Sequence, residues 1–281
     1  MIKFTQHLLL LATTISYLQV YAQKTTGKLS LSEGQQLKLE QAVKISSTLN
    51  LMGQEVNMTA DANMEYNIAV QKKMPAAFLL NSTLKKMKSA VTAMGETQHY
   101  DSDKPEDNNT ETGKIVQGMI NKPAELEIGA DGAVLNSKPA ADYNTNSMNM
   151  VQGLLSGNDN YAGASEAFLV IPAGIKKGDS WQDSSQTDGM KLLRNFTLTA
   201  INGNRATVTV SGTQYSNKTV EQMGMEIAIT VEAVLNGEAV VNINNGIIEQ
   251  KTITAKGTGN AEMMGQSIPM TTLVTSSSIV K

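Results

Sequence analysis

Apolar and polar residues alternate along most of this chain, and the pattern is clearest between residues 37 and 70. Apolar side chains occupy the odd positions from Leu37 to Leu51 and, after a Met-Gly pair, the even positions from Val56 to Val70. A period of two predicts β-strands with one apolar and one polar face. At about 15 residues each, these strands would be roughly 50 Å long. Strands of that length must twist and curl, so we expect the apolar face to be concave.

The first half of the chain continues this pattern with two interruptions. Phe78–Met94 predicts a third strand, and a slip of phase at Lys85-Lys86 predicts a β-bulge. Gly113–Asn121 has apolar residues at helical spacing and is followed by a proline, so we expect a short helix there. Asp131-Gly132, between two short apolar runs, predicts a hairpin.

The second half alternates in the same way. Strands are predicted at Leu192–Ile201, Arg205–Val210, Met225–Leu235, Ala239–Ile243, Ile247–Ala255 and Ile268–Val280. Asn-Gly between alternating runs is a strong hairpin signal. It predicts turns at Asn202-Gly203, Asn236-Gly237 and Asn245-Gly246. We therefore expect a mainly β protein with long curved antiparallel sheet in two meander halves and one or two short helices. Spacing leaves open whether the halves form one continuous sheet or two domains.

The first residues of the chain resemble a secretory signal peptide. Lys3 precedes an apolar run at Leu8–Ile15, and Val20-Tyr21-Ala22 places a small residue at the cleavage point. The apolar run is shorter than the roughly 20 residues that a membrane-spanning helix needs, and no later stretch approaches that length. The sequence predicts an exported protein of the periplasm or cell envelope that is not transmembrane after cleavage.

These patterns divide the chain into four parts. Residues 1–22 are the predicted signal peptide, and residues 23–142 the N-terminal β half. Residues 143–165 are a connector rich in Asn, Ser and Gly, and residues 166–281 the C-terminal β half. The Met-Gly pair at Met52-Gly53 recurs at Met264-Gly265 and more loosely at Met223-Gly224, each time before an alternating strand. Duplication and convergent turn chemistry both account for this repeat.

Several of these features together resemble a known family. They are the export signal ending in Ala-Gln, the Met-Gly turns, Ala130-Asp131-Gly132 and the stretch IPAGIKKGDSW at Ile171–Trp181. In them the chain is similar to an uncharacterised family of secreted proteins from Bacteroidota, known only as a domain of unknown function. The resemblance implies a periplasmic or outer-membrane-associated setting, and it supplies no activity and no site residues.

Composition narrows the function further. The chain has 23 Lys and Arg against 26 Asp and Glu, a net charge of −3, with no basic cluster. This balance disfavours nucleic-acid binding, which depends on clustered cations. The absence of cysteine excludes disulfides, thiolate metal sites and a thiol nucleophile.

No catalytic motif stands out, so we expect neither an enzyme nor a cofactor. His99 borders a polar loop, and Ser82-Thr83-Leu84-Lys85 matches the S-x-x-K motif without its partner motifs. Residues three apart in a strand also point to opposite faces. Asp101, Asp103, Glu106 and Asp107 offer oxygen ligands, and Asn158-Asp159-Asn160 forms a second cluster, but neither fits a known calcium loop. A solvated acidic loop is the simpler interpretation, and calcium binding by Asp101–Asp107 is left open.

Methionine is the unusual component, with 16 Met against 4 Phe and 1 Trp. We predict an apolar ligand surface at Met58, Met64, Tyr66, Met87 and Met270. One interpretation is a deformable Met surface on a curved sheet that binds a lipid, an acyl chain or an apolar protein segment. The alternative is a structural or interaction module with a closed β core, no small-molecule ligand and an envelope protein as partner.

Overall fold

The computed structural model describes residues 25, 27–51, 53–93, 95–138, 163–187, 189–222, 225–263 and 265–281. The predicted signal peptide and most of the predicted connector, including its helical candidate at residues 148–155, lie outside the described residues. Within the described residues, 12 strands form one antiparallel sheet.

The strands fall into two meanders that follow each other along the chain. The first contains β1 (Gln36–Leu51), β2 (Gln54–Lys73), β3 (Ala77–Ala93), β4 (Glu96–Asp101), β5 (Pro123–Gly129) and β6 (Val134–Lys138). The second contains β7 (Ser180–Thr187), β8 (Met190–Asn202), β9 (Arg205–Gln222), β10 (Met225–Asn242), β11 (Ile248–Met263) and β12 (Gln266–Val280). The helical pieces are η1 (Pro105–Asn109), α1 (Glu111–Val116) and η2 (Ala164–Ala167).

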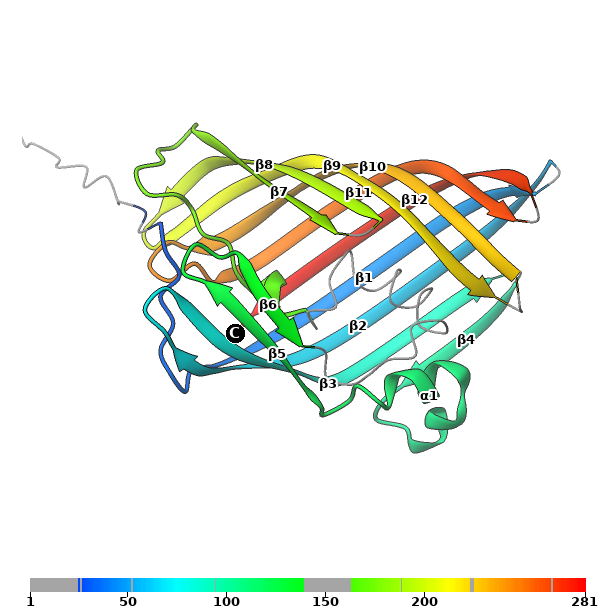
Figure 1. Ribbon diagram of the computed structural model, residues 1–281, viewed down its shortest axis with the longest axis horizontal. Helices are drawn as coiled ribbons and strands as arrows, with labels where there is room; N and C mark the ends of the chain where they lie inside the picture. The colour runs from blue at the N-terminus through cyan, green and yellow to red at the C-terminus, as the bar shows by residue number, and fades with distance from the viewer. Residues whose placement is uncertain are drawn as a thin grey trace, which may run out of the picture.

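One strand pair joins the two meanders into a single sheet. The first strand, β1, pairs with β2 on one side and with the last strand, β12, on the other. The spatial order is β6-β5-β3-β2-β1-β12-β11-β10-β9-β8-β7, with β4 added beside β3. The sheet curls so that β5, β6 and β7 come round to the same side, in front of the long strands, and β6 and β7 remain unpaired with each other (Figure 1). The predicted fold class is confirmed, and the halves form one continuous, unclosed sheet.

The register gives this sheet an inner and an outer face. Leu39 of β1 is paired with Tyr66 of β2 and with Val280 of β12, so these three side chains share one face, here called the inner face. The predicted slip of phase is a real bulge, because Glu65 pairs with Lys86 while Tyr66 pairs with Leu84. The bulge leaves Lys85 as the extra residue and keeps the apolar side chains of β3 on the inner face.

One end of the inner face, called the covered end, is closed by segments outside the long strands. Leu29, Leu31, Ala167, Phe168 and Ile171 are each at most 7% exposed and pack against the inner face. Backbone hydrogen bonds hold these segments in place, from the Leu29 N–H to the Ala130 carbonyl at 2.7 Å and from the Leu169 N–H to the Gly246 carbonyl at 2.9 Å. In this region both meanders contribute to the same apolar core.

Three local predictions need correction, and one strand was missed. The strand predicted at Arg205–Val210 is too short, because β9 continues to Gln222. The helix expected at Gly113–Asn121 is α1, which spans Glu111–Val116 and is shorter than expected. It begins earlier because Thr110 caps it by accepting a hydrogen bond from the Gly113 N–H at 3.0 Å. The edge strand β7 was not predicted, since SWQDSSQT has no apolar alternation. The prediction of a turn at Asn236-Gly237 is wrong. The runs on either side of it form the single strand β10, while Asn202-Gly203 and Asn245-Gly246 do turn the chain.

Close packing of neighbouring strands explains the glycine in the middle of β10. A Cβ atom on Gly237 would lie 2.2 Å from the Thr252 carbonyl oxygen and 2.6 Å from a methyl carbon of Ile253. Gly203, by contrast, has a φ of +60° and open space around it. The first glycine permits close approach of backbone, and the second permits a left-handed turn.

Asparagine substitutions separate these two roles, because asparagine tolerates a left-handed turn but not a close contact. Gly237→Asn is expected to lower the free energy of unfolding by about 2–3 kcal/mol, since the new side chain must displace β11. Gly203→Asn, the matched control, is expected to change it by no more than about 0.5 kcal/mol. Urea unfolding followed by circular dichroism measures both, and equal stability of the two variants would contradict the assignment.

Candidate functional site

The five residues predicted to form an apolar surface share the inner face of the sheet. Met64 of β2 pairs with Met87 of β3, and Met58 pairs with Ala93 three rows nearer the other end of β3. Met270 of β12 pairs with Leu49 of β1, whose inner-face position follows from the same register. The structure therefore brings together, on one face, residues that are more than 200 positions apart in the sequence.

Burial divides these five residues into two groups. Met64, Tyr66 and Met87 are 4%, 7% and 2% exposed, and the Tyr66 hydroxyl donates a hydrogen bond to the Met64 sulfur at 3.3 Å. These three side chains are part of the packed core. Met58 and Met270 are only partly buried.

The same gradient runs along β1 and β2, whereas Ala261 of β11 and Ile268 of β12 are buried although they lie near the opposite end. Near the covered end, Leu39 and Ile68 are completely buried. Towards the opposite end the inner face carries polar as well as apolar side chains, among them Ser47, which donates a hydrogen bond to Thr272 at 3.0 Å, and most of its apolar residues are only partly buried. These residues are Leu49, Leu51, Val56, Met58, Ile227, Met263 and Met270. Because removing apolar surface from water lowers the free energy, this part of the inner face is suited to contact an apolar ligand.

Two ion pairs lie on the inner face, between the covered end and the partly buried opposite end. Lys251 of β11 is bonded to Glu166 of η2, and the Lys251 side chain is only 12% exposed. Arg194 of β8 donates two hydrogen bonds to the Asp183 carboxylate of β7, at 2.8 and 2.7 Å. The Arg194 guanidinium also lies 5.5 Å from the ring centre of Phe196. The first pair ties η2 to the sheet, and the second ties the edge strand β7 to β8.

These cations determine the charge of Glu166. Burial by itself raises the pKa of the Glu166 carboxyl, but the neighbouring Lys251 and Arg194 outweigh burial and hold the pKa below its ordinary value of 4.5. Glu166 is therefore ionised at neutral pH, and its negative charge is matched by Lys251. Sequence reasoning missed this pair, because its members are 85 positions apart and neither belongs to a motif.

One buried hydroxyl beside Lys251 lacks a hydrogen bond. Lys251, Ser278 and Gln41 lie side by side in one row across β11, β12 and β1. Ser278 is 1% exposed, and in the described part of the chain its hydroxyl has no partner. Buried polar groups are nearly always bonded, so the Ser278 hydroxyl adds a polar point to the inner face beside the Lys251–Glu166 ion pair.

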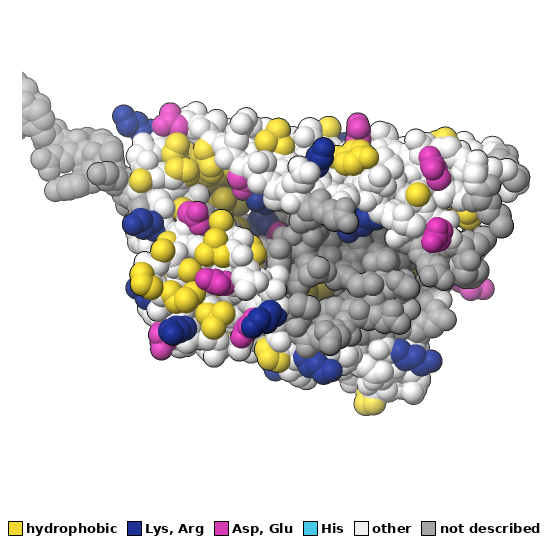
Figure 2. All heavy atoms as spheres, in the orientation of Figure 1, with side chains coloured by type: hydrophobic (Ala, Val, Ile, Leu, Met, Phe, Trp, Pro, Cys, Tyr) yellow, Lys and Arg dark blue, Asp and Glu magenta, His cyan; other side chains and the backbone are white. Residues whose placement is uncertain are grey.

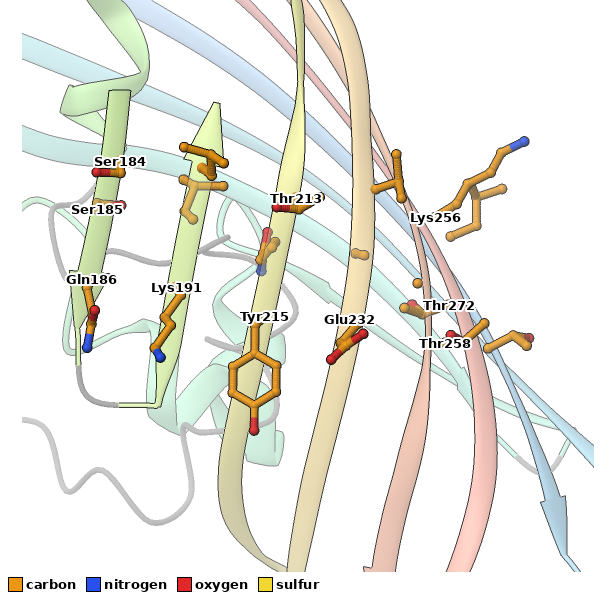
Figure 3. Close-up of a pocket in the computed structure, with 18 of the residues that line it drawn as sticks. Ser184, Ser185, Gln186, Lys191, Thr213, Tyr215, Glu232, Lys256, Thr258 and Thr272 are labelled. Carbon is orange, nitrogen blue, oxygen red and sulfur yellow. The ribbon is translucent and has the colours of Figure 1, made fainter. Parts of the chain in front are cut away.

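The outer face is mostly polar and carries a shallow groove. Figure 2 shows scattered charged and isolated apolar side chains on the upper strands, among uncharged polar ones. The groove has a volume of about 1120 Å³ and crosses β7 to β12 and β1. Tyr215, Lys191 and Glu232 lie in neighbouring positions on β9, β8 and β10 (Figure 3). One row further along, Leu193, Val234 and Leu273 are 43%, 54% and 41% exposed.

The residues considered for catalysis are separated in space. Ser82 is buried on the inner face, whereas Lys85 points to the outer side and donates to the Asn121 amide oxygen at 2.7 Å. His99 is exposed on β4 opposite Ala90, which is eight residues, or roughly 25 Å, along β3 from Ser82. The described residues thus do not place the serine near the histidine or the lysine.

The acidic loop considered for calcium uses its oxygens internally. Lys88 bonds to Asp101 at 2.9 Å and lowers the pKa of that carboxyl, and Lys86 lies 3.3 Å from Asp103. The Asp107 carboxylate accepts a hydrogen bond from the Asp101 N–H at 2.8 Å. Among the described residues, no group of three or more His, Cys, Asp or Glu side chains is placed to hold a metal ion. The second predicted cluster, at residues 158–160, lies outside the described residues.

In the part of the chain that the structure describes, no helix is long and apolar enough to cross a membrane. Fold and inner face together define the class of protein: a single, unclosed antiparallel sheet with a partly covered apolar inner face. The chain belongs to the family of unknown function DUF6263, whose model matches residues 76–248. This confirms membership of an uncharacterised family, while the bacterial phylum and export remain predictions. None of the curated proteins matches the chain.

Solved structures show only distant likeness. A lipovitellin structure titled for its lipid–protein interactions aligns with 90% of this chain at a TM-score of 0.49 and 12% identity. The chain spans only 25% of the lipovitellin chain. An outer membrane channel from Pseudomonas putida F1 aligns with 90% of this chain and 98% of its own, at a TM-score of 0.27 and 9% identity. At these scores neither structure supports a conclusion about function.

Proposed function

We propose that this protein is exported to the periplasm or cell envelope, catalyses no reaction, and binds an apolar ligand on the inner face of its curled sheet. The ligand class is a lipid or acyl chain, or an apolar segment of another protein. The observation that carries the proposal is the gradient of burial along the inner face. The apolar surface of β1 continues beyond the described segments that cover it, for roughly 20 Å from Ile45 to Leu51 at ~3.3 Å per residue.

The chemistry of this surface supports a flexible apolar ligand. Methionine has an unbranched, polarizable side chain that adapts to irregular partners, and Met58, Met263 and Met270 all lie on the partly buried part. The export signal read from the sequence supports an envelope location. The separation of Ser82, Lys85 and His99 supports the absence of catalysis.

Native mass spectrometry of the protein, purified gently from its own cells, tests this proposal. The expected result is a species heavier than the polypeptide, whose extra mass disappears on solvent extraction and is identified as lipid or acyl chain. A bare polypeptide mass, together with no uptake of added fatty acid or phospholipid, would refute the lipid form of the proposal.

A second candidate function rests on the outer groove. Three exposed apolar side chains, Leu193, Val234 and Leu273, lie there in one cross-strand row, and exposed apolar groups often mark contact sites between proteins. This arrangement favours the structural or interaction module. Binding of a hydrophobic dye to the two variants Leu273→Asp and Met58→Asp distinguishes the functions. If Leu273→Asp no longer binds the dye and Met58→Asp still does, the second function is favoured over the first.

A further inference from the structure

Five two-residue hairpins gather at the end of the sheet opposite the covered end. They connect β1 to β2, β3 to β4, β7 to β8, β9 to β10 and β11 to β12, as the pairs that flank each turn show. Four of these hairpins reach the far end of the sheet, at the right of Figure 1. The β7–β8 hairpin stops short, because Met190 at the start of β8 pairs with Ser216, whereas β9 continues to Gln222. We call the far end, formed by the four longer hairpins, the hairpin rim.

The sequence at the hairpin rim differs from that at the shorter hairpin. All four rim turns have Met-Gly at their two central positions, whereas the β7–β8 turn has Asp-Gly. The glycines described there, Gly53, Gly95 and Gly265, have φ values of +85°, +84° and +76°, which a side chain at those positions would strain. The turn methionines, at positions 52, 94, 223 and 264, lie outside the described residues, so the inference rests on their neighbours.

Apolar side chains on the inner face continue to the hairpin rim and are only partly buried there. Leu51 and Val56 belong to the β1–β2 hairpin, Met263 to the β11–β12 hairpin, and Ile227 to the β9–β10 hairpin. The rim thus presents an apolar edge built from segments distant in the sequence. Such an edge, bordered by polar groups, is typical of a contact surface between proteins.

The charged residues next to the four rim turns have one sign. An exposed glutamate lies within three residues of each rim turn, namely Glu55, Glu96, Glu226 and Glu262. No lysine or arginine occurs within four residues of any of the four turns in the sequence. At the covered end, by contrast, Lys72, Lys73 and Arg205 lie beside the turns that follow β2 and β8.

We propose that the hairpin rim is a docking surface for a partner protein whose contacting face is basic and apolar. Charge complementarity identifies the occupant, because four carboxylates around an apolar edge attract a cationic surface and align it. The same carboxylates repel the negative surface of an anionic lipid bilayer, so a protein is favoured over a membrane. This inference does not depend on a ligand being bound to the inner face.

The test uses a synthetic amphipathic helix of leucine and lysine as the probe and a leucine–glutamate helix as its counterpart. The wild-type protein is expected to bind the basic peptide, measured by fluorescence anisotropy, and not the acidic one. The fourfold variant Glu55→Gln, Glu96→Gln, Glu226→Gln and Glu262→Gln is expected to lose about tenfold in affinity for the basic peptide, since each exposed charge pair contributes little.

A matched variant controls for total charge. It carries Glu33→Gln, Asp61→Asn, Glu106→Gln and Glu238→Gln, four exposed carboxylates away from the rim and the outer groove, and is expected to bind within twofold of wild type. All eight positions are exposed, so both variants are expected to fold, which circular dichroism verifies. Equal losses in both variants, no binding of the basic peptide by wild type, or stronger binding to phosphatidylglycerol vesicles than to the peptide would each overturn the proposal.

Discussion

Met64→Asp is expected to leave the protein unfolded, whereas Met58→Asp is expected to fold and to lose its apolar ligand. The two methionines lie on the same strand and the same face, three rows apart, and differ in burial. Met64 is 4% exposed and contacts Tyr66 in the core, so burial shields a carboxylate at this position from solvent. Such a burial costs about 5 kcal/mol or more, which approaches the whole free energy of folding of about 5–15 kcal/mol.

Met58 lies where the inner face is only partly buried. An aspartate at this position keeps access to water, and the expected loss of stability is about 1 kcal/mol. The same charge makes the inner face unfavourable for an acyl chain. Thermal unfolding measures the first effect, and binding of a fluorescent fatty acid measures the second.

Leu273→Asp is the matched control, because Leu273 is 41% exposed on the outer face. This variant is expected to fold and to bind the fatty acid as the wild type does. If Met58→Asp also unfolds the protein, the partly buried region is core and the proposed function loses its support. If Met64→Asp folds normally, the core assignment of Met64 is wrong.

Lys251→Met is expected to lower the free energy of unfolding at pH 7 by about 2–3 kcal/mol. Removing the ammonium leaves the Glu166 carboxylate on the inner face without its main partner, and breaking a buried pair on one side is costly. The side chain of Glu166 is 35% exposed and Arg194 still attracts it, which keeps the cost below that of a fully buried ion. The double variant Lys251→Met with Glu166→Leu removes both charges and is expected to recover most of the loss.

This prediction has a defined pH dependence. In the wild type the folded-state pKa of Glu166 lies below its ordinary value of 4.5. Its stabilising contribution is therefore complete above about pH 4.5 and is lost as the pH falls through the lower, folded-state pKa. In Lys251→Met, burial raises the pKa instead, and protonation of Glu166 relieves the destabilisation.

The difference in stability between wild type and Lys251→Met is therefore expected to be largest near pH 7 and to shrink below pH 4.5. Denaturant unfolding across this pH range, with Glu166→Gln as a variant that cannot titrate, measures the effect. A difference that stays constant with pH would show that Lys251 stabilises the fold by packing alone.

Alternation in the sequence was sufficient to predict the long strands and the face to which each side chain belongs. β1 and β2 were correctly predicted from a period of two, and the bulge at Lys85 from a slip of phase. The five residues chosen for the apolar surface do share one face, since register in an antiparallel pair follows directly from the turn. The Asn-Gly pairs could not be assigned to turns from the sequence alone. Gly203 lies in a turn, whereas Gly237 lies within a strand and permits close packing of the neighbouring strand.

Only the tertiary structure decided which part of the apolar face is core. Met58 and Met64 are equivalent in a pattern of alternation, yet among the described residues the covering segments around Leu29 and Phe168 reach one region and not the other. The pairing of β1 with β12, the ion pair between Glu166 and Lys251, and the gathering of four Met-Gly hairpins at one rim also join distant positions. The position of a residue along a strand determines the face on which its side chain lies, because successive side chains of a strand point to opposite faces. What covers that face depends on segments far away in the chain, which meet it only when the sheet curls.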